Sequence, residues 1–282
     1  MNVPPVLTVA ALTIHESARR RVLRALVAMT VLLLALSAFG FSRIDAEFSG
    51  LTSGEARLVA SLVLNLVMFG LSLIAALGTA FLAGPTLAGE IESGMALAVL
   101  ARPVRRTAVL VGKWLGLITF GSGFVLVAGA AHFVIVWVTV GYWPPDPVTG
   151  LTLLAAQTTV LLTLGLMLST VISPMASGIV AVGLFGATWI AGIVGTIGEL
   201  IGNDDVARVG TISRMLLPTD GLWRGAMHAF QDPSVLGVYT ANEGPHPFLG
   251  DSSLTPAYLG WVVLWVLLVL GLASVSYRRR DL

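Results

Sequence analysis

The sequence predicts an all-α polytopic membrane protein with six transmembrane helices, an N-terminal interfacial helix and a short helix in a cytoplasmic loop. Of its 282 residues, 56% are hydrophobic and only 11% are charged, whereas a soluble domain carries about 25% charged residues. Six apolar runs are long enough to cross ~30 Å of hydrocarbon at 1.5 Å per residue. The alternation typical of a membrane β-barrel is absent. This composition excludes a soluble enzyme, a nucleic-acid-binding protein and a disordered chain.

The N-terminal stretch, residues 6–21, is amphipathic and ends in three arginines. We expect an interfacial helix there, lying against the inner leaflet. The region before the first apolar run is too long and too polar for the start of a signal peptide, so the first span is expected to be retained. The expected spans are approximately 22–41, 58–83, 108–141, 151–172, 178–199 and 257–277.

The connections between spans differ in length. Residues 173–177 form a tight inner turn, and residues 200–256 form a long outer segment with five prolines. Within the outer segment, 206–217 and 222–230 are expected to be short surface or re-entrant helices. Their apolar side chains favour an ordered segment, because disorder normally requires low hydrophobicity.

The distribution of charge predicts the orientation. With both termini inside, eleven of the sixteen Lys and Arg residues face the cytoplasm, together with four of the fifteen acids. The remaining five basic residues and eleven acids fall outside. Cytoplasmic loops carry an excess of Lys and Arg. The sequence therefore predicts a multi-pass protein of a bacterial plasma membrane with both termini cytoplasmic.

The cytoplasmic loop 84–107 is expected to contain a short helix of its own. Gly84-Pro85 is expected to end the second span, since proline cannot continue a helix without losing a hydrogen bond. Apolar residues recur at helical spacing from Thr86, and Pro103 ends the helix. The basic residues expected at the membrane interface are Arg102, Arg105, Arg106 and Lys113. A helix between two breakers is suited to docking into a soluble partner, although an ordinary amphipathic loop helix with solvated charges is the alternative.

Residues 89–116 resemble the permease subunits of type-2 ABC transporters. The pattern in those proteins is E-x-x-x-G, then apolar residues, P-[VLI]-x-R and a Gly-Lys pair that opens the third span. The matching positions are Glu90, Gly94, Pro103, Arg106, Gly112 and Lys113. The basic N-terminal stretch, Pro218-Thr219-Asp220 and the C-terminal YRRR agree with this resemblance. Length, span count and the placement of Pro218-Thr219-Asp220 are most similar to the NosY-like branch, although turn 173–177 lacks the lysines common there.

The resemblance implies a subunit that dimerises with a second permease copy and receives an ABC ATP-binding subunit. A homodimer is expected, with a heterodimer as the alternative. The helix 86–99 is then the coupling helix, seated in a groove of the ATPase. The docking residues are Leu87, Glu90, Ile91, Glu92, Gly94 and Met95. The expected function is ATP-driven export of a lipid, drug or peptide-like substrate, or a NosY-like task in metalloenzyme maturation.

Motifs for chemistry are absent from the sequence. It has no G-x-x-x-x-G-K-[ST], so ATP and Mg²⁺ are expected in the partner subunit and no cofactor in this chain. His15-Glu16 does not continue as a zinc-protease helix and the chain has no cysteine, so no metal site is expected. Membrane lipids are the remaining expected partner, and nucleic acid is not one.

Three polar residues lie within the spans: Asn65, His132 and Gln157. Such residues usually face the interior of the bundle. They either line a substrate pathway or form ordinary hydrogen bonds between helices. A secondary transporter is a rival class, but it should show internal repeats and ionisable groups at the midplane, which this sequence lacks.

Overall fold

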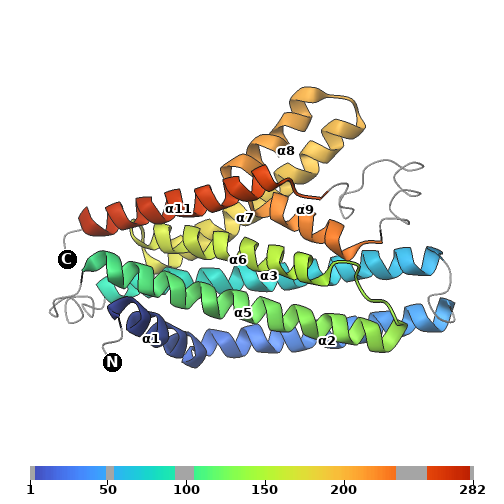
Figure 1. Ribbon diagram of the computed structural model, residues 1–282, viewed down its shortest axis with the longest axis horizontal. Helices are drawn as coiled ribbons and strands as arrows, with labels where there is room; N and C mark the ends of the chain where they lie inside the picture. The colour runs from blue at the N-terminus through green and yellow to red at the C-terminus, as the bar shows by residue number, and fades with distance from the viewer. Residues whose placement is uncertain (1–3, 49–53, 93–104, 233–252, 280–282) are drawn as a thin grey trace.

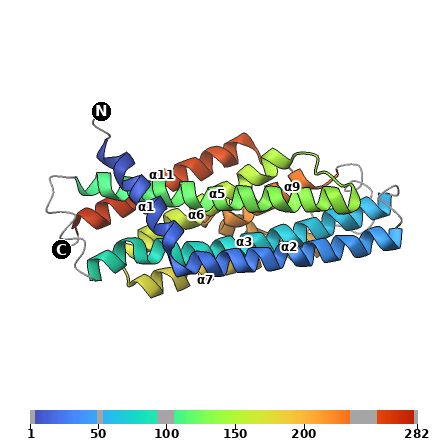
Figure 2. The same ribbon diagram turned by 90° about the horizontal axis from the view of Figure 1, so that it is seen from below.

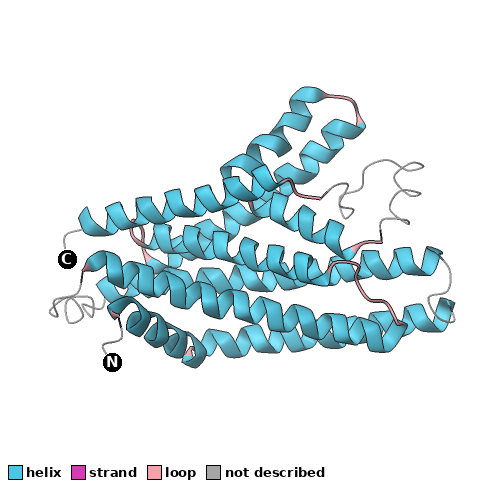
Figure 3. Ribbon diagram, in the orientation of Figure 1, coloured by secondary structure: helices cyan, strands magenta, loops and turns pink. Residues whose placement is uncertain are grey.

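The computed structural model describes residues 4–48, 54–92, 105–232 and 253–279. Every described element is a helix (Figure 3). In chain order the helices are α1 (Pro5–Arg19), α2 (Arg21–Phe48), α3 (Gly54–Glu92), α5 (Arg106–Val140), α6 (Pro147–Ser169), α7 (Pro174–Leu200), α8 (Asp204–Leu216), α9 (Thr219–Phe230) and α11 (Pro256–Arg279). Six of these, namely α2, α3, α5, α6, α7 and α11, are long and apolar enough to cross a membrane. The predicted all-α class with six membrane-spanning helices is confirmed.

The six long helices run side by side along the long axis of the molecule (Figure 1). The N-terminus of α1 and the C-terminus of α11 lie at the same end of the bundle, as an even number of crossings requires. We call it the terminal end, and it also holds the start of α5. The short helix α1 crosses the neighbouring helices steeply (Figure 2) and packs against α5.

The expected break at Gly84-Pro85 is wrong. Helix α3 continues through Pro85 to Glu92, so the second span is longer than expected and residues 86–92 are part of it. An interior proline costs about 3 kcal/mol, but side chains on both sides of it are packed. Ala83 and Leu87 are fully buried, and Thr86 hydrogen-bonds to the carbonyl of Leu82. Tertiary packing therefore holds the helix together where its local sequence favours an end.

The outer segment contains the two short helices that its sequence predicted. Helix α8 forms a hairpin with α7 that leans away from the bundle (Figure 1), and α9 returns to pack along α6. In α9 most side chains are buried, including Trp223 and Phe230. The described part of the outer segment thus has one helix that projects from the bundle and one that packs against it, while 233–252 lie outside the described residues.

The main core lies where α9 meets the long helices. Trp223 packs against Phe69, whose ring also stacks on Trp189 with centroids 4.8 Å apart. In the loop between α5 and α6, the buried Tyr142 hydroxyl donates to the carbonyl of Phe230 at 2.7 Å. Burial raises the pKa of this hydroxyl, so it keeps the proton that it donates. The contact of Trp223 with α3 and the contact of Phe230 with the loop before α6 therefore fix the position of α9.

Candidate functional site

An ion pair joins α3 and α5 near the terminal end. Lys113 of α5 pairs with Glu90 of α3, and its ammonium also donates to the carbonyl oxygen of Thr86 at 2.7 Å. The lysine side chain is only 6% exposed and the glutamate 19%. Because a buried charge is costly unless it is paired and hydrogen-bonded, this lysine depends on its two partners from α3.

The residue before this lysine faces a different helix. A Cβ at Gly112 would lie 2.7 Å from the carbonyl oxygen of Val6, and one at Gly116 would lie equally close to that of Ala10. Only glycine therefore allows α1 to approach α5 this closely. The Gly-Lys pair of α5 thus contacts two other helices: α1 packs closely against Gly112, and Lys113 pairs with α3. We call this arrangement the α1–α5–α3 joint.

The predicted docking residues do not form one exposed surface. Leu87 is 1% exposed and packs in a core cluster with Leu110 and Leu117, so its expected outward placement is wrong. Glu90 points into the bundle to Lys113, and among these residues Glu92 is exposed at the end of α3. The backbone of Ile91 belongs to α3, whereas Gly94 and Met95 lie outside the described residues. The helical turn at 86–92 therefore continues the second span instead of forming a separate helix.

The basic residues expected at the membrane interface divide into two groups. Arg105 is exposed, and Arg106 donates to the carbonyl of Arg278 at 3.3 Å. Both lie at the start of α5, while Arg102 is outside the described residues. Lys113 lies two helical turns inside α5 and is buried by its pairing with Glu90, so it does not join the two arginines at the start of the helix.

Gln157 is the centre of a buried hydrogen-bond network. Its Oε1 accepts from the Ser72 hydroxyl at 2.8 Å, and its Nε2 donates to the carbonyl oxygen of Thr219 at 3.2 Å. The Thr219 hydroxyl is 3.0 Å from that of Thr188. The network links α3, α6, α7 and α9, so Gln157 connects helices in this conformation.

Asn65 and His132 are also fully buried. The imidazole Nδ1 of His132 lies 2.7 Å from the carbonyl oxygen of Ala128, one turn earlier in α5, while Nε2 has no hydrogen-bond partner in the described structure.

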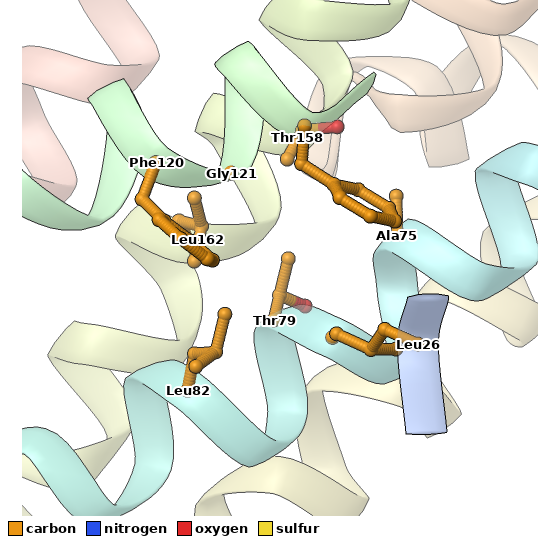
Figure 4. A pocket seen from close by; sticks show the side chains of 10 residues that line it. Leu26, Ala75, Thr79, Leu82, Phe120, Gly121, Thr158 and Leu162 are labelled. Atoms are coloured by element: carbon orange, nitrogen blue, oxygen red, sulfur yellow. The ribbon is translucent and has the colours of Figure 1, made fainter. Parts of the chain in front are cut away.

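Two cavities of very different size bear on a substrate pathway. A cavity between α2, α3, α5 and α6 has a volume of about 20 Å³ (Figure 4), about enough for one water molecule. Leu26, Leu82, Phe120 and Leu162 close around it. A much larger groove of about 670 Å³ lies on the outside, between α3 and α7, and its lining is apolar, including Phe81, Met175 and Ile179. We call it the α3–α7 groove.

A buried carboxylate in α9 holds the hairpin of α7 and α8, which we call the outer hairpin. Its role was not predicted from the sequence. Asp220, with 2% of its side chain exposed, accepts from Arg214 at 3.1 Å and from Arg224 at 3.0 Å. Arg224 also donates to the carbonyl oxygen of Gly192 and to Thr196, both at 2.9 Å. The signal in the sequence was one acid flanked by two arginines, six residues before and four residues after it.

The C-terminal carbonyls of α8 are satisfied by α11. Tyr258, Trp261 and Trp265 donate to the carbonyl oxygens of Arg214, Met215 and Leu216, respectively. The last carbonyls of a helix lack partners within it, so these three side chains cap α8 from a helix that is distant in the sequence. Aromatic residues at this level also suit a membrane interface.

The pattern that joins Glu90, Gly112 and Lys113 in the sequence thus has a structural meaning, and a comparison decides the family. A family model described as ABC-2 family transporter protein matches residues 10–282. The chain belongs to this family. A comparison with curated proteins found no match.

Membership in the ABC-2 transporter family makes the chain a permease subunit of an ABC transporter, a membrane component that is not itself catalytic. It also implies an ABC ATP-binding partner. The six apolar helices agree with a multi-pass membrane protein. The secondary-transporter alternative is therefore set aside.

Proposed function

We propose that this ABC-2 permease subunit belongs to an ATP-driven exporter of a bacterial plasma membrane, with both chain ends in the cytoplasm. The excess of Lys and Arg in the segments assigned to that side supports this orientation. ATP and Mg²⁺ would bind the partner ATPase. This chain would contribute the membrane pathway and the surface on which the ATPase acts.

The α1–α5–α3 joint is the observation that carries the coupling proposal. Helix α3 ends at Glu92, two residues after the glutamate of the Glu90–Lys113 pair. A force applied to the loop after α3 by the ATPase would reach α5 through the ion pair, and α1 through the close contact at Gly112. Such a rigid link suits a transporter that alternates between two conformations by rigid-body movement. Ile91, Glu92, Gly94 and Met95 remain the proposed docking positions.

The pathway is proposed to lie between two copies of the chain. The interior cavity is too small for a substrate, whereas the α3–α7 groove is large and open on the outer surface of the described chain. A homodimer would place two such grooves at one interface, and a heterodimer would pair one with a related permease. The apolar lining supports a lipid, drug or apolar peptide as the substrate.

The NosY-like task is the alternative substrate assignment. Pro218-Thr219-Asp220 suggested it, but Thr219 and Asp220 are buried and hold helices together. Their presence is thus explained by packing of the outer hairpin and does not by itself favour that branch.

Co-purification with the ATPase tests the docking proposal. When it is purified from its native membrane in mild detergent, the permease should bring down a Walker-motif protein. Glu92→Arg should reduce the amount of that protein recovered, because the new arginine would repel the basic groups of the ATPase that are expected to contact Glu92. Glu16→Arg is the matched control, because Glu16 is also an exposed acid assigned to the same side. Equal recovery for Glu92→Arg and the wild type would contradict docking at the end of α3.

A further inference from the structure

A basic cleft lies at the terminal end, between the start of α5 and the end of α11. Its lining is Arg105, Arg106, Thr107 and Arg278, and its volume is about 430 Å³. A second cleft of about 330 Å³ shares Arg278 and adds Arg279 and Val275. Both volumes fall within the range of about 300–1,000 Å³ that is usual for ligand pockets. No acid lines either cleft among the described residues.

One hydrogen bond from a side chain to a backbone carbonyl joins the two helices that line the cleft. Arg106 donates to the carbonyl oxygen of Arg278, which ties the first turn of α5 to the last turn of α11. No side chain caps the N-terminus of α5. The first amides of a helix point outward and favour an anion. Arginine side chains from two helices and a helix N-terminus thus face one space.

An apolar stripe continues from the cleft along the outer surface of α11. Leu268, Leu272 and Val275 are 53%, 57% and 46% exposed. Their spacing of three and four residues places them on one face of the helix, which continues to Arg279 four residues after Val275. In a membrane this face meets acyl chains, and the arginines lie where the apolar span ends.

We propose that this cleft binds the phosphate of an anionic membrane phospholipid, whose acyl chain lies along α11. The guanidinium groups supply planar, bidentate donors for phosphate oxygens. Basic pockets between transmembrane helices are suited to acidic headgroups. The continuous apolar stripe favours a lipid over a soluble phosphate or an acidic surface of the ATPase, because neither of those would use Leu268, Leu272 and Val275. The lipid would hold α11 against α5.

Native mass spectrometry of the purified full chain with phosphatidylglycerol tests this assignment. The variant Arg105→Gln/Arg278→Gln removes two cleft charges and keeps Arg106, which makes the backbone contact. We expect phosphatidylglycerol binding to weaken by roughly tenfold or more, because each arginine near an anionic lipid contributes several-fold. The control Arg21→Gln/Arg24→Gln removes two exposed charges at the start of α2 and should leave binding nearly unchanged. Equal weakening in both variants would overturn the specific site.

Three further arms separate the possible ligands. Phosphatidylcholine should bind weakly in all variants, and inorganic phosphate should not displace phosphatidylglycerol; displacement at similar concentrations would indicate a soluble-phosphate site and overturn the proposal. Loss of ATPase recovery in Arg105→Gln/Arg278→Gln with unchanged lipid binding would assign the cleft to the partner instead. Arg105→Lys/Arg278→Lys keeps both charges and controls for misfolding, and we expect it to bind phosphatidylglycerol with intermediate affinity. If this variant and Arg105→Gln/Arg278→Gln both bound phosphatidylglycerol like the wild type, the proposal would be overturned.

Discussion

Lys113 of α5 and Glu90 of α3 form a buried ion pair whose two residues are 23 positions apart in the sequence. The lysine also donates to the carbonyl of Thr86, so α5 holds the last turns of α3 at two points. These turns extend beyond Pro85 to the loop that the family resemblance assigns to the ATPase. The pair therefore stands between the membrane bundle and the proposed docking segment.

Removal of one member of the Glu90–Lys113 pair should destabilise the protein strongly. Lys113→Met removes the buried ammonium that pairs with Glu90, and breaking a buried pair in this way costs about 3–5 kcal/mol. The double variant Glu90→Gln/Lys113→Met should recover much of that loss, because it removes both charges. Thermal unfolding in detergent, arranged as a double-mutant cycle, measures the coupling. Additive effects of the two substitutions would show that the pair does not stabilise the fold.

Gly112→Leu should displace α1 from α5. Its side chain would enter the space held by the carbonyl of Val6 and the side chain of Val9. We expect faster proteolysis of residues 5–19 in membrane vesicles, with the six spans retained. Gly123→Leu is the control on the same helix, since a Cβ there would meet nothing within 4 Å. Similar cleavage in both variants would contradict a specific α1–α5 contact.

Asp220→Asn should loosen the outer hairpin. The substitution removes the carboxylate charge that holds Arg214 and Arg224, and we expect a loss of about 3 kcal/mol or more. Hydrogen exchange should rise in α8 and α9 before it rises in α5. Asp205→Asn, which affects an exposed pair with Arg208, should cost about 1 kcal/mol or less. Uniform exchange throughout the bundle would contradict a local role for Asp220.

Cysteine labelling should place the two ends of the bundle on opposite sides of the membrane. The sequence has no cysteine, so labelling of a single introduced cysteine is not obscured by reaction at any other cysteine of the chain. Ser253→Cys, exposed before α11, should react with an impermeant maleimide from outside intact cells. Arg279→Cys, exposed at the other end of the same helix, should react only after the membrane is opened. The reverse pattern would invert the proposed orientation.

Long-range contacts explain why some site residues lie elsewhere than their sequence indicated. The sequence pattern located Glu90, Gly112 and Lys113 as related positions, but it assigned Glu90 to a partner and Lys113 to the membrane interface. Spacing along a helix cannot show that a lysine near its start reaches an acid on another helix. The same limit applies to Asp220: its arginine partners lie near it in the chain, but the residues of α7 to which Arg224 donates do not.

The sequence by itself determined the six spans and the two outer helices, because each depends on local properties: apolar length, helical spacing and the positions of proline. Only the tertiary structure decided that α3 runs through Pro85, that Leu87 is a core residue and that Lys113 is buried. The reason is physical. A proline or a charge is unfavourable locally at these positions, and its cost is offset by packing and pairing with residues that only the folded chain brings close.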